Sequence, residues 1–166
     1  MTAFERSLAA LLLAIALGGA QVAIAQGYVC AVSSVGSLDF MIYDPASPSP
    51  ATASGTVTLT CTHVAGAVQR INWSMQLSNG GSGDCAARAM TGPTGALGYN
   101  VYQNSVGGGV WGNAGCRSFP TGQLSVGPGA GNNTRSISNR LLGQIPSGQY
   151  VSAGSYGETL TLTISY

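Results

Sequence analysis

The side chains best suited to covalent or metal chemistry in this chain are four cysteines and a single histidine, His63. Four cysteines allow three disulfide pairings, and an even count suits an oxidising compartment. Zinc is the alternative, but zinc sites usually contain ligand pairs a few positions apart, whereas no two of these cysteines are closer than 24 positions. The spacing therefore favours disulfides over a metal centre, and the cysteines concerned are Cys30, Cys61, Cys85 and Cys116.

Catalytic chemistry finds little support among the polar residues. His63 lies in the short segment THVAG, and no serine or cysteine has the context of a nucleophile elbow. Asp39 and Asp44 could form a carboxylate pair, but Asp39 fits an outward-facing strand position and Asp44 precedes a proline, as turn residues do. Because no nucleophile, base and orienting residue come together, we expect no enzyme, no catalytic residue, no metal and no cofactor.

Two tryptophans could contact a sugar or a surface, since an indole ring has a large apolar face and a polar edge. Trp73 alternates with apolar residues and is therefore expected in the core. Trp111 follows a run of glycines in a short apolar stop, so it is the candidate surface contact.

Charged residues are scarce in this chain of 166 residues, which has six arginines, no lysine and five acidic residues. Nucleic acids and anionic membranes are bound by clustered basic residues, so neither is an expected partner. The 25 glycines, together with many serines, threonines and valines, favour a single β-rich domain with many turns.

Residues 1–25 have the three-part pattern of a secretory signal peptide. Arg6 lies in a polar start, an apolar run follows that is too short to span a bilayer, and Ala23-Ile24-Ala25 gives the cleavage pattern. An amphipathic helix or a membrane anchor is the alternative. We expect export and a mature domain of residues 26–166 without an integral membrane segment, with cleavage after Ala20 as a second possibility.

The mature chain contains six to eight short runs of alternating apolar and polar residues, separated by turn residues, and no convincing helix. This spacing predicts an all-β, immunoglobulin-like antiparallel sandwich, with a closed barrel as the alternative. The segment before 35 looks irregular, so the first strand is expected at 37–43. The clearest later runs lie at 56–62, 71–78, 97–102, 136–145 and 159–166.

The last run has one apolar and one polar face. Leu160, Leu162, Ile164 and Tyr166 alternate with threonine and serine. An apolar strand at the edge of a sheet must be covered, because its open edge otherwise recruits other chains. We expect the cover to come from another protein.

Several segments together resemble the spore coat protein U domain family, which includes the subunits of archaic chaperone–usher pili. They are Cys30, LDFMIYDP at 38–45, GTVTLTCT at 55–62, MQLSNGGSG at 75–83, the pair Arg88 and Met90, and the end of the chain, GQIPSGQYVSAGSYGETLTLTISY. The family usually has glycine after the phenylalanine of its first strand, where this chain has Met41.

The resemblance implies a sandwich that lacks its last strand. A periplasmic chaperone supplies that strand first, and the N-terminal extension of the next subunit replaces it at an outer-membrane usher. The groove that receives it would include Phe40, Leu160, Leu162, Ile164 and Tyr166. The resemblance also implies a Cys30–Cys61 disulfide, which leaves Cys85 to pair with Cys116.

The resulting expectation is a structural subunit of a secreted surface pilus that serves adhesion or biofilm formation. Few residues precede Cys30 after cleavage, so the chain is expected to accept a strand without donating one, as a tip or minor subunit would. The alternative is a secreted coat or envelope protein with the same fold that does not polymerise through an usher.

Overall fold

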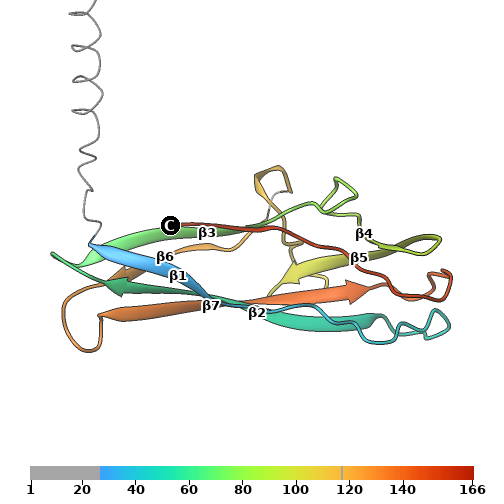
Figure 1. Cartoon of the computed structure of the whole chain (residues 1–166), viewed down its shortest axis with the longest axis horizontal. Coiled ribbons are helices and arrows are strands. Elements are labelled where there is room, and N and C mark those ends of the chain that lie inside the picture. The colour runs from blue at the N-terminus through green and yellow to red at the C-terminus, as the bar shows by residue number, and fades with distance from the viewer. Residues whose placement is uncertain (1–26, 117) are drawn as a thin grey trace, which may run out of the picture.

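The computed structural model describes residues 27–116 and 118–166. The predicted signal peptide, 1–25, lies outside these residues and stays a prediction. In the described part, eight strands and one short 3₁₀ helix follow each other along the chain (Figure 1). Their bounds are β1 Tyr28–Val35, β2 Ala51–His63, β3 Gln69–Leu77, β4 Arg88–Gly92, β5 Gly95–Gln103, η1 Ala114–Cys116, β6 Thr121–Val126, β7 Thr134–Ile145 and β8 Leu162–Ser165.

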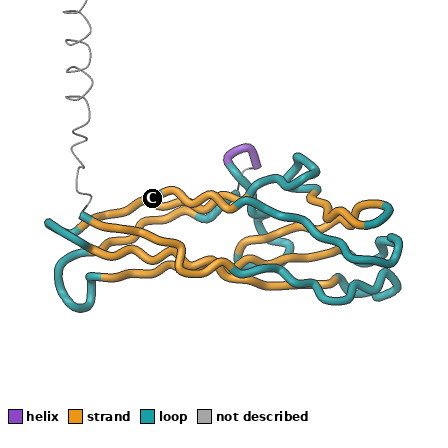
Figure 2. Tube along the Cα trace, in the orientation of Figure 1, coloured by secondary structure: helices purple, strands orange, loops and turns teal. Residues whose placement is uncertain are grey.

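The strands form two antiparallel sheets, which confirms the predicted all-β sandwich. One sheet has the order β1-β2-β7-β5-β4 and the other the order β6-β3-β8. Figure 1 shows β3 and the C-terminal segment in the upper layer, with β2 and β7 in the lower layer. Long connecting segments lie toward one end of the sandwich (teal in Figure 2).

Period-two alternation places the core between the two sheets. Val57, Leu59 and Cys61 of β2 are fully buried, while the threonines between them lie on the outer face. Met75 of β3 and Val101 of β5 are fully buried in the same core. Trp73, expected in this core, is half-buried and packs against it. The alternation predicted for these strands is therefore present in the folded chain.

Both disulfides implied by the family resemblance are present. Cys30 and Cys61 face each other across β1 and β2, with Cα atoms 4.0 Å apart. Cys85 and Cys116 join the segment before β4 to the end of η1, with Cα atoms 6.1 Å apart. Each bridge closes a chain separation of 31 residues, which in the chain-entropy model stabilises the fold by roughly 3–4 kcal/mol.

The first strand lies earlier in the chain than the sequence suggested. Residues 28–35 form β1 because they pair with β2, whereas 37–43 is not assigned to a strand and has no ladder partner among the described residues. Ile42, expected to face inward, is 92% exposed. Residues 37–43 thus alternate in sequence without forming a strand, because no described strand pairs with them.

Met41 occupies the position where the family usually has glycine, and its backbone is left-handed, with φ at 56°. Only glycine adopts this conformation without a steric cost from Cβ. The Met41 N–H donates to Asp39 Oδ1 at 2.9 Å, which holds the turn. Because the Met41 side chain is 84% exposed, replacing it sacrifices little packing.

Met41→Gly should therefore raise the free energy of unfolding, by up to about 1 kcal/mol, since strain relief exceeds the extra entropy of the unfolded chain. Urea unfolding of the purified protein measures the change. Ile42→Gly is the matched control, because Ile42 is similarly exposed and has no left-handed backbone. That control should lose stability; a loss of similar size in Met41→Gly would contradict the strain argument.

Candidate functional site: a groove between two free strand edges

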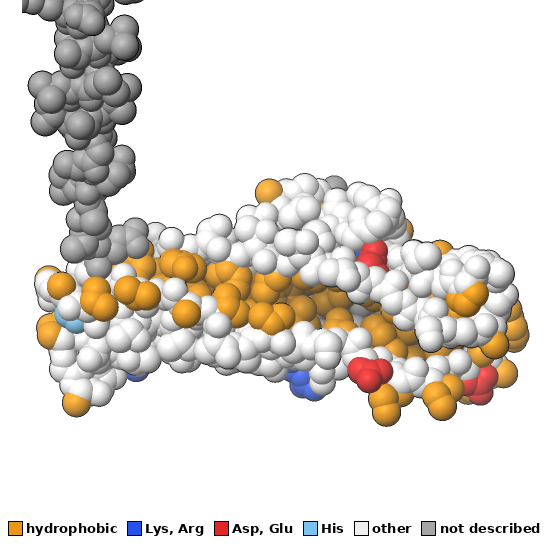
Figure 3. Space-filling view, viewed as in Figure 1, with side chains coloured by type: hydrophobic (Ala, Val, Ile, Leu, Met, Phe, Trp, Pro, Cys, Tyr) orange, Lys and Arg blue, Asp and Glu red, His pale blue; other side chains and the backbone are white. Residues whose placement is uncertain are grey.

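The groove lies between β1 and the C-terminal segment, which border opposite sheets. Among the described residues, β1 pairs only with β2, and β8 pairs only with β3. Each strand therefore has one edge with no ladder partner from the described chain. Figure 3 shows a long band of hydrophobic side chains between the two layers, along this opening.

Two valines of β1 face the core but are not covered. Val32 lies opposite Leu59 and Val35 opposite Val57, and residues paired across a ladder point to the same face of the sheet. The partners Leu59 and Val57 are fully buried, yet Val32 is 45% and Val35 64% exposed. A register irregularity at Ser33 keeps both valines on this inner face. The inner face of β1 thus lacks a covering layer at Val32 and Val35, beyond the buried Cys30.

The opposite wall of the groove is the C-terminal segment. Leu160, Leu162 and Ile164 are half-buried and pack against the core, while the threonines between them are exposed. The ladder to β3 covers only Leu162–Ser165, shorter than the run that alternates in sequence, because β3 ends at Leu77. Residues before 162 are held outside this ladder: Ser78 and Thr161 exchange two hydrogen bonds of 2.9 Å, and Gly157 forms an isolated antiparallel bridge with Thr91.

One end of the groove is closed by Tyr166. Its hydroxyl donates to the Cys30 carbonyl oxygen at 3.2 Å, and half of its surface remains exposed. The short Cα separation of Cys30 and Cys61 is typical of a non-hydrogen-bonded pair, whose backbone groups point away from the partner strand. The Cys30 carbonyl therefore belongs to the free edge of β1, and Tyr166 occupies it.

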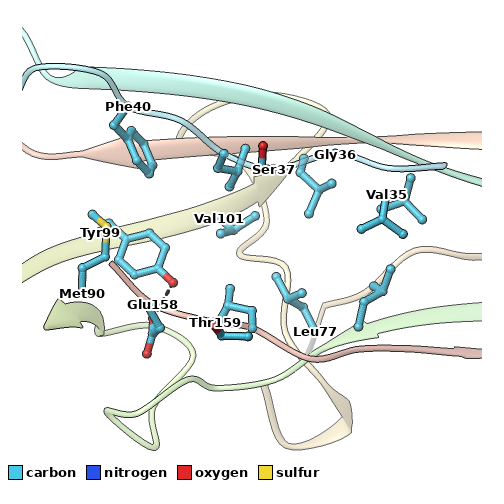
Figure 4. A pocket seen from close by; sticks show the side chains of 15 residues that line it. Val35, Gly36, Ser37, Phe40, Leu77, Met90, Tyr99, Val101, Glu158 and Thr159 are labelled. Carbon is cyan, nitrogen blue, oxygen red and sulfur yellow. Dashed lines mark hydrogen bonds between the residues drawn. The ribbon is translucent and has the colours of Figure 1, made fainter. Parts of the chain in front are cut away.

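The groove consists of two adjoining compartments. The first has a volume of about 310 Å³ and lies between Val35–Leu38 and Glu158–Leu160, with Val57 and Val101 beneath it (Figure 4). The second has a volume of about 890 Å³ and lies between 37–43 and 151–158. Of the residues predicted for the groove, Phe40, Leu160 and Leu162 line the first compartment together, while Ile164 and Tyr166 lie toward the closed end.

Phe40 packs against the sheet at Gly143 of β7, which has no side chain. A Cβ atom on Gly143 would lie 2.5 Å from Phe40 Cζ, closer than real Cβ contacts. The ring of Phe40 also packs edge-on against Tyr99, with centroids 6.1 Å apart and planes at 70°. Glycine at 143 thus allows the unpaired segment 37–43 to form a wall of the groove.

A hydrogen-bonded pair lies in the first compartment, next to the boundary that Glu158 shares with the second. The Tyr99 hydroxyl, from β5, donates to Glu158 Oε2, from the C-terminal segment (dashed in Figure 4). Glu158 Oε1 accepts the Gly81 N–H at 2.6 Å. Burial, followed by the bond to Glu158, raises the pKa of Tyr99 well above its ordinary value.

The raised pKa of Tyr99 should make the fold sensitive to alkali. Below pH ~10 the tyrosine is protonated in both states; above it, the unfolded state releases the proton first and gains stability. Unfolding free energy should fall with rising pH by at most about 1.4 kcal/mol per pH unit from this group. Tyr99→Phe should flatten that decline between pH 9 and 11 in urea titrations, while an unchanged slope would contradict the assignment.

Arg88, which pairs with Tyr99 across β4 and β5, is 1% exposed. Among the residues that the structure describes, it is the charged residue that is buried. Its Nε and Nη2 donate to the Ser78 carbonyl at 3.1 and 2.7 Å, and Nη2 also donates to the Trp111 carbonyl at 2.8 Å. Burial lowers the pKa of Arg88. The guanidinium thereby links β4 to Ser78, which directly follows β3. Ser78 in turn bonds to Thr161 of the C-terminal segment.

Trp111 is not a surface contact, and that expectation was wrong. Its side chain is fully buried, and its Nε1 donates to the Met75 carbonyl at 2.9 Å. The backbone of Trp111 bonds to Val101 and Arg88, so the segment after β5 folds back over the core. A large aromatic ring in the core buries more apolar surface than it could on a loop.

The remaining polar candidates are used in local structure. Asp39 Oδ1 and Asp44 Oδ1 each accept a backbone N–H two residues ahead, as turn residues do. His63 contacts the Gly66 carbonyl in its own loop. Within residues 27–116 and 118–166, no three histidine, cysteine or acidic side chains gather as a metal site requires. The same residues contain no helix long and apolar enough to cross a membrane.

Comparison with known proteins shows to which family the chain belongs. Among solved structures, the chain is similar to the crystal structure of the CsuC–CsuE chaperone–tip adhesion subunit pre-assembly complex from archaic chaperone–usher Csu pili of Acinetobacter baumannii. The sequence identity is 19% and the TM-score 0.51; the match covers 84% of this chain and 40% of that chain, and it shows a shared fold. No curated protein matches the chain. The model of the spore coat protein U domain matches residues 16–163. The chain therefore belongs to the spore coat protein U domain family.

Proposed function

We propose that this protein is a structural subunit of a surface pilus assembled by the chaperone–usher pathway, and that its groove receives a β-strand from a partner. The observation that carries the proposal is the pair Val32 and Val35, which face the core and remain exposed. A strand inserted between β1 and β8 would cover them and pair with both free edges.

The energetics favour such an insertion. Fully burying a valine or leucine stabilises a protein by about 1.5–3 kcal/mol, and the groove offers several partly exposed ones on its two walls. Backbone hydrogen bonds along both edges add to this, as in other cases of strand addition. An isolated subunit is therefore expected to be marginally stable, whereas a complemented subunit is expected to be highly stable.

The proposal includes the partners and the route. The solved complex that resembles this chain contains a chaperone and a tip adhesion subunit, and a periplasmic chaperone is accordingly the first partner proposed here. An outer-membrane usher and other pilus subunits follow, with localisation in the periplasm and then at the cell surface. A role at the tip or as a minor subunit, in adhesion or biofilm formation, is part of the same proposal.

Gel electrophoresis of the surface fraction tests polymerisation. A polymer held by inserted strands should give a ladder in detergent without heating, and the ladder should collapse to a monomer on boiling without reductant. The alternative, a coat or envelope protein that does not polymerise through an usher, predicts a monomer that is stable without a partner. Finding only that monomer before boiling would refute the pilus proposal.

A further inference from the structure

Tyr166 joins the two walls of the groove at one end. It follows β8 of the three-stranded sheet, and its hydroxyl donates to the carbonyl oxygen of Cys30, on β1 of the five-stranded sheet, at 3.2 Å. Figure 1 shows the C-terminal end of the chain beside β3, toward the end of the sandwich where β1 begins. The side chain therefore crosses the opening between the two free strand edges.

The Cys30 carbonyl is a pairing group of the free β1 edge. Cys30 and Cys61 form a non-hydrogen-bonded pair, so the backbone N–H and C=O of Cys30 point away from β2. This pattern repeats at every second residue of an antiparallel ladder, so Val32 presents its backbone groups to the same edge. For a strand that covers the exposed Val32 side chain, Cys30 is therefore the neighbouring pairing position.

An inserted strand and Tyr166 compete for this carbonyl. A backbone N–H that pairs with Cys30 must place its nitrogen about 2.7–3.2 Å from the carbonyl oxygen, and the Tyr166 hydroxyl oxygen already lies at that distance. Neighbouring strands lie about 4.8 Å apart, so the backbone of the incoming strand would also run through the space that the phenol occupies. The strand and the phenol thus exclude each other at Cys30.

The contacts of Tyr166 allow it to move aside. Half of its surface is exposed, and the ladder between β8 and β3 ends one residue earlier, at the pair of Ser165 with Ser74. Among residues 27–116 and 118–166, the Tyr166 hydroxyl is bonded to Cys30 alone. Because one hydrogen bond makes only a modest net contribution, the side chain can be displaced without unfolding the subunit.

We infer that Tyr166 is a latch on the groove, an inference that rests on the proposed function. In the free subunit the latch is closed, and the hydroxyl occupies the pairing group of Cys30. An incoming strand takes the Cys30 carbonyl and releases the phenol to solvent. The contact is autoinhibitory: it slows the capture of a strand, because only molecules with an open latch offer the full edge of β1.

Tyr166→Phe removes the hydroxyl and keeps the ring. This variant should capture a strand at least threefold faster, because the latch bond no longer has to be broken. Its dissociation rate should stay within twofold of the wild-type rate, since the bond is absent from the complex of either protein. The probe is an eleven-residue synthetic peptide of alternating threonine and valine with a lysine at each end, labelled with fluorescein, and stopped-flow anisotropy gives both rates.

Tyr150→Phe is the matched control. Tyr150 lies in the segment after β7 and is 81% exposed, so the loss of its hydroxyl should change neither rate. A side chain that only lines the groove would act differently from a latch, because loss of a contact with the bound strand speeds dissociation and leaves association unchanged. An unchanged association rate or a faster dissociation in Tyr166→Phe would therefore overturn the latch.

Fluorine NMR follows the latch directly. Protein labelled with fluorotyrosine gives a resonance for Tyr166, which is assigned by its absence from Tyr166→Phe. Saturating peptide should move this resonance toward that of the exposed Tyr150, and an unmoved resonance in a complex that forms would contradict the opening of the latch. Binding to Tyr166→Phe alone would be the extreme form of the expected result. If the peptide binds neither protein, the groove takes no strand and the proposed function itself fails.

Discussion

An aspartate in place of Val35 should weaken the capture of a partner strand at least a hundredfold while leaving the fold of the subunit intact. Val35 is 64% exposed in the described structure, so a charge there remains solvated in the free protein. An inserted strand would cover this position, and covering an unpaired carboxylate in an apolar groove is strongly unfavourable. A hundredfold loss corresponds to about 2.7 kcal/mol of binding free energy.

Val29→Asp is the matched control for this experiment. Val29 lies on the same strand and is 59% exposed, but it pairs with Thr62 on the outer face of the sheet. The probe for both variants is an eleven-residue synthetic peptide of alternating threonine and valine with a lysine at each end. Its dissociation constant should change little in this control, and circular dichroism should show both variants folded. Equal weakening by the two aspartates would mean that the strand does not bind at the inner face of β1.

The second large effect is expected in stability. Arg88→Met should lower the free energy of unfolding by about 3–5 kcal/mol, because the carbonyls of Ser78 and Trp111 lose their buried donor. Methionine fills a similar length with apolar atoms but donates no hydrogen bond. The loosened end of β3 should also release the C-terminal segment that Ser78 holds.

Urea unfolding of the purified subunit measures the loss, with Arg70→Met as the control. Arg70 lies exposed on β3, so its replacement should change stability by less than about 0.5 kcal/mol. Hydrogen exchange should show faster exchange at the amides of Ser78 and Thr161, which bond to each other's residue, in Arg88→Met. A stable Arg88→Met protein would mean that the apolar replacement compensates for the two orphaned carbonyls.

Local alternation was sufficient to predict much of the β structure. Threonines between Val57, Leu59 and Cys61 mark one wet and one dry face, and burial follows that pattern. The same argument marked Leu160, Leu162 and Ile164 as one apolar row. Such patterns are readable because the side chains of a strand alternate strictly, whatever the strand pairs with.

Strand bounds could not be read in the same way. The segment 37–43 alternates but has no ladder partner among the described residues, whereas 28–35, which looks irregular, pairs with β2 over its length. Ladder pairing depends on a neighbour far away in the chain, and the disulfide between Cys30 and Cys61 fixes that neighbour for β1. The pairing of the four cysteines itself came only from the family resemblance.

The hydrogen-bonded pair Tyr99 and Glu158 and the buried Arg88 also escaped prediction as a unit. Arg88, Tyr99 and Glu158 are far apart in sequence, and nothing in their local contexts links them. The scarcity of charged residues was the available signal. Glu158 is an isolated acid just before an apolar strand, and such a carboxylate needs a hydrogen-bond donor. Trp111 was misjudged for a similar reason, because its burial depends on Met75 and Arg88 rather than on neighbours in sequence.

By itself, the amino-acid sequence determined the β class, the faces of the strands and a C-terminal row of apolar residues that demands a cover. Only the tertiary structure decided where that row lies relative to β1, which valines face an open groove, and that Tyr99 and Glu158 are hydrogen-bonded beside it. The reason is physical: alternation is set by the local geometry of a strand, while a groove exists only where distant strands leave two edges unpaired.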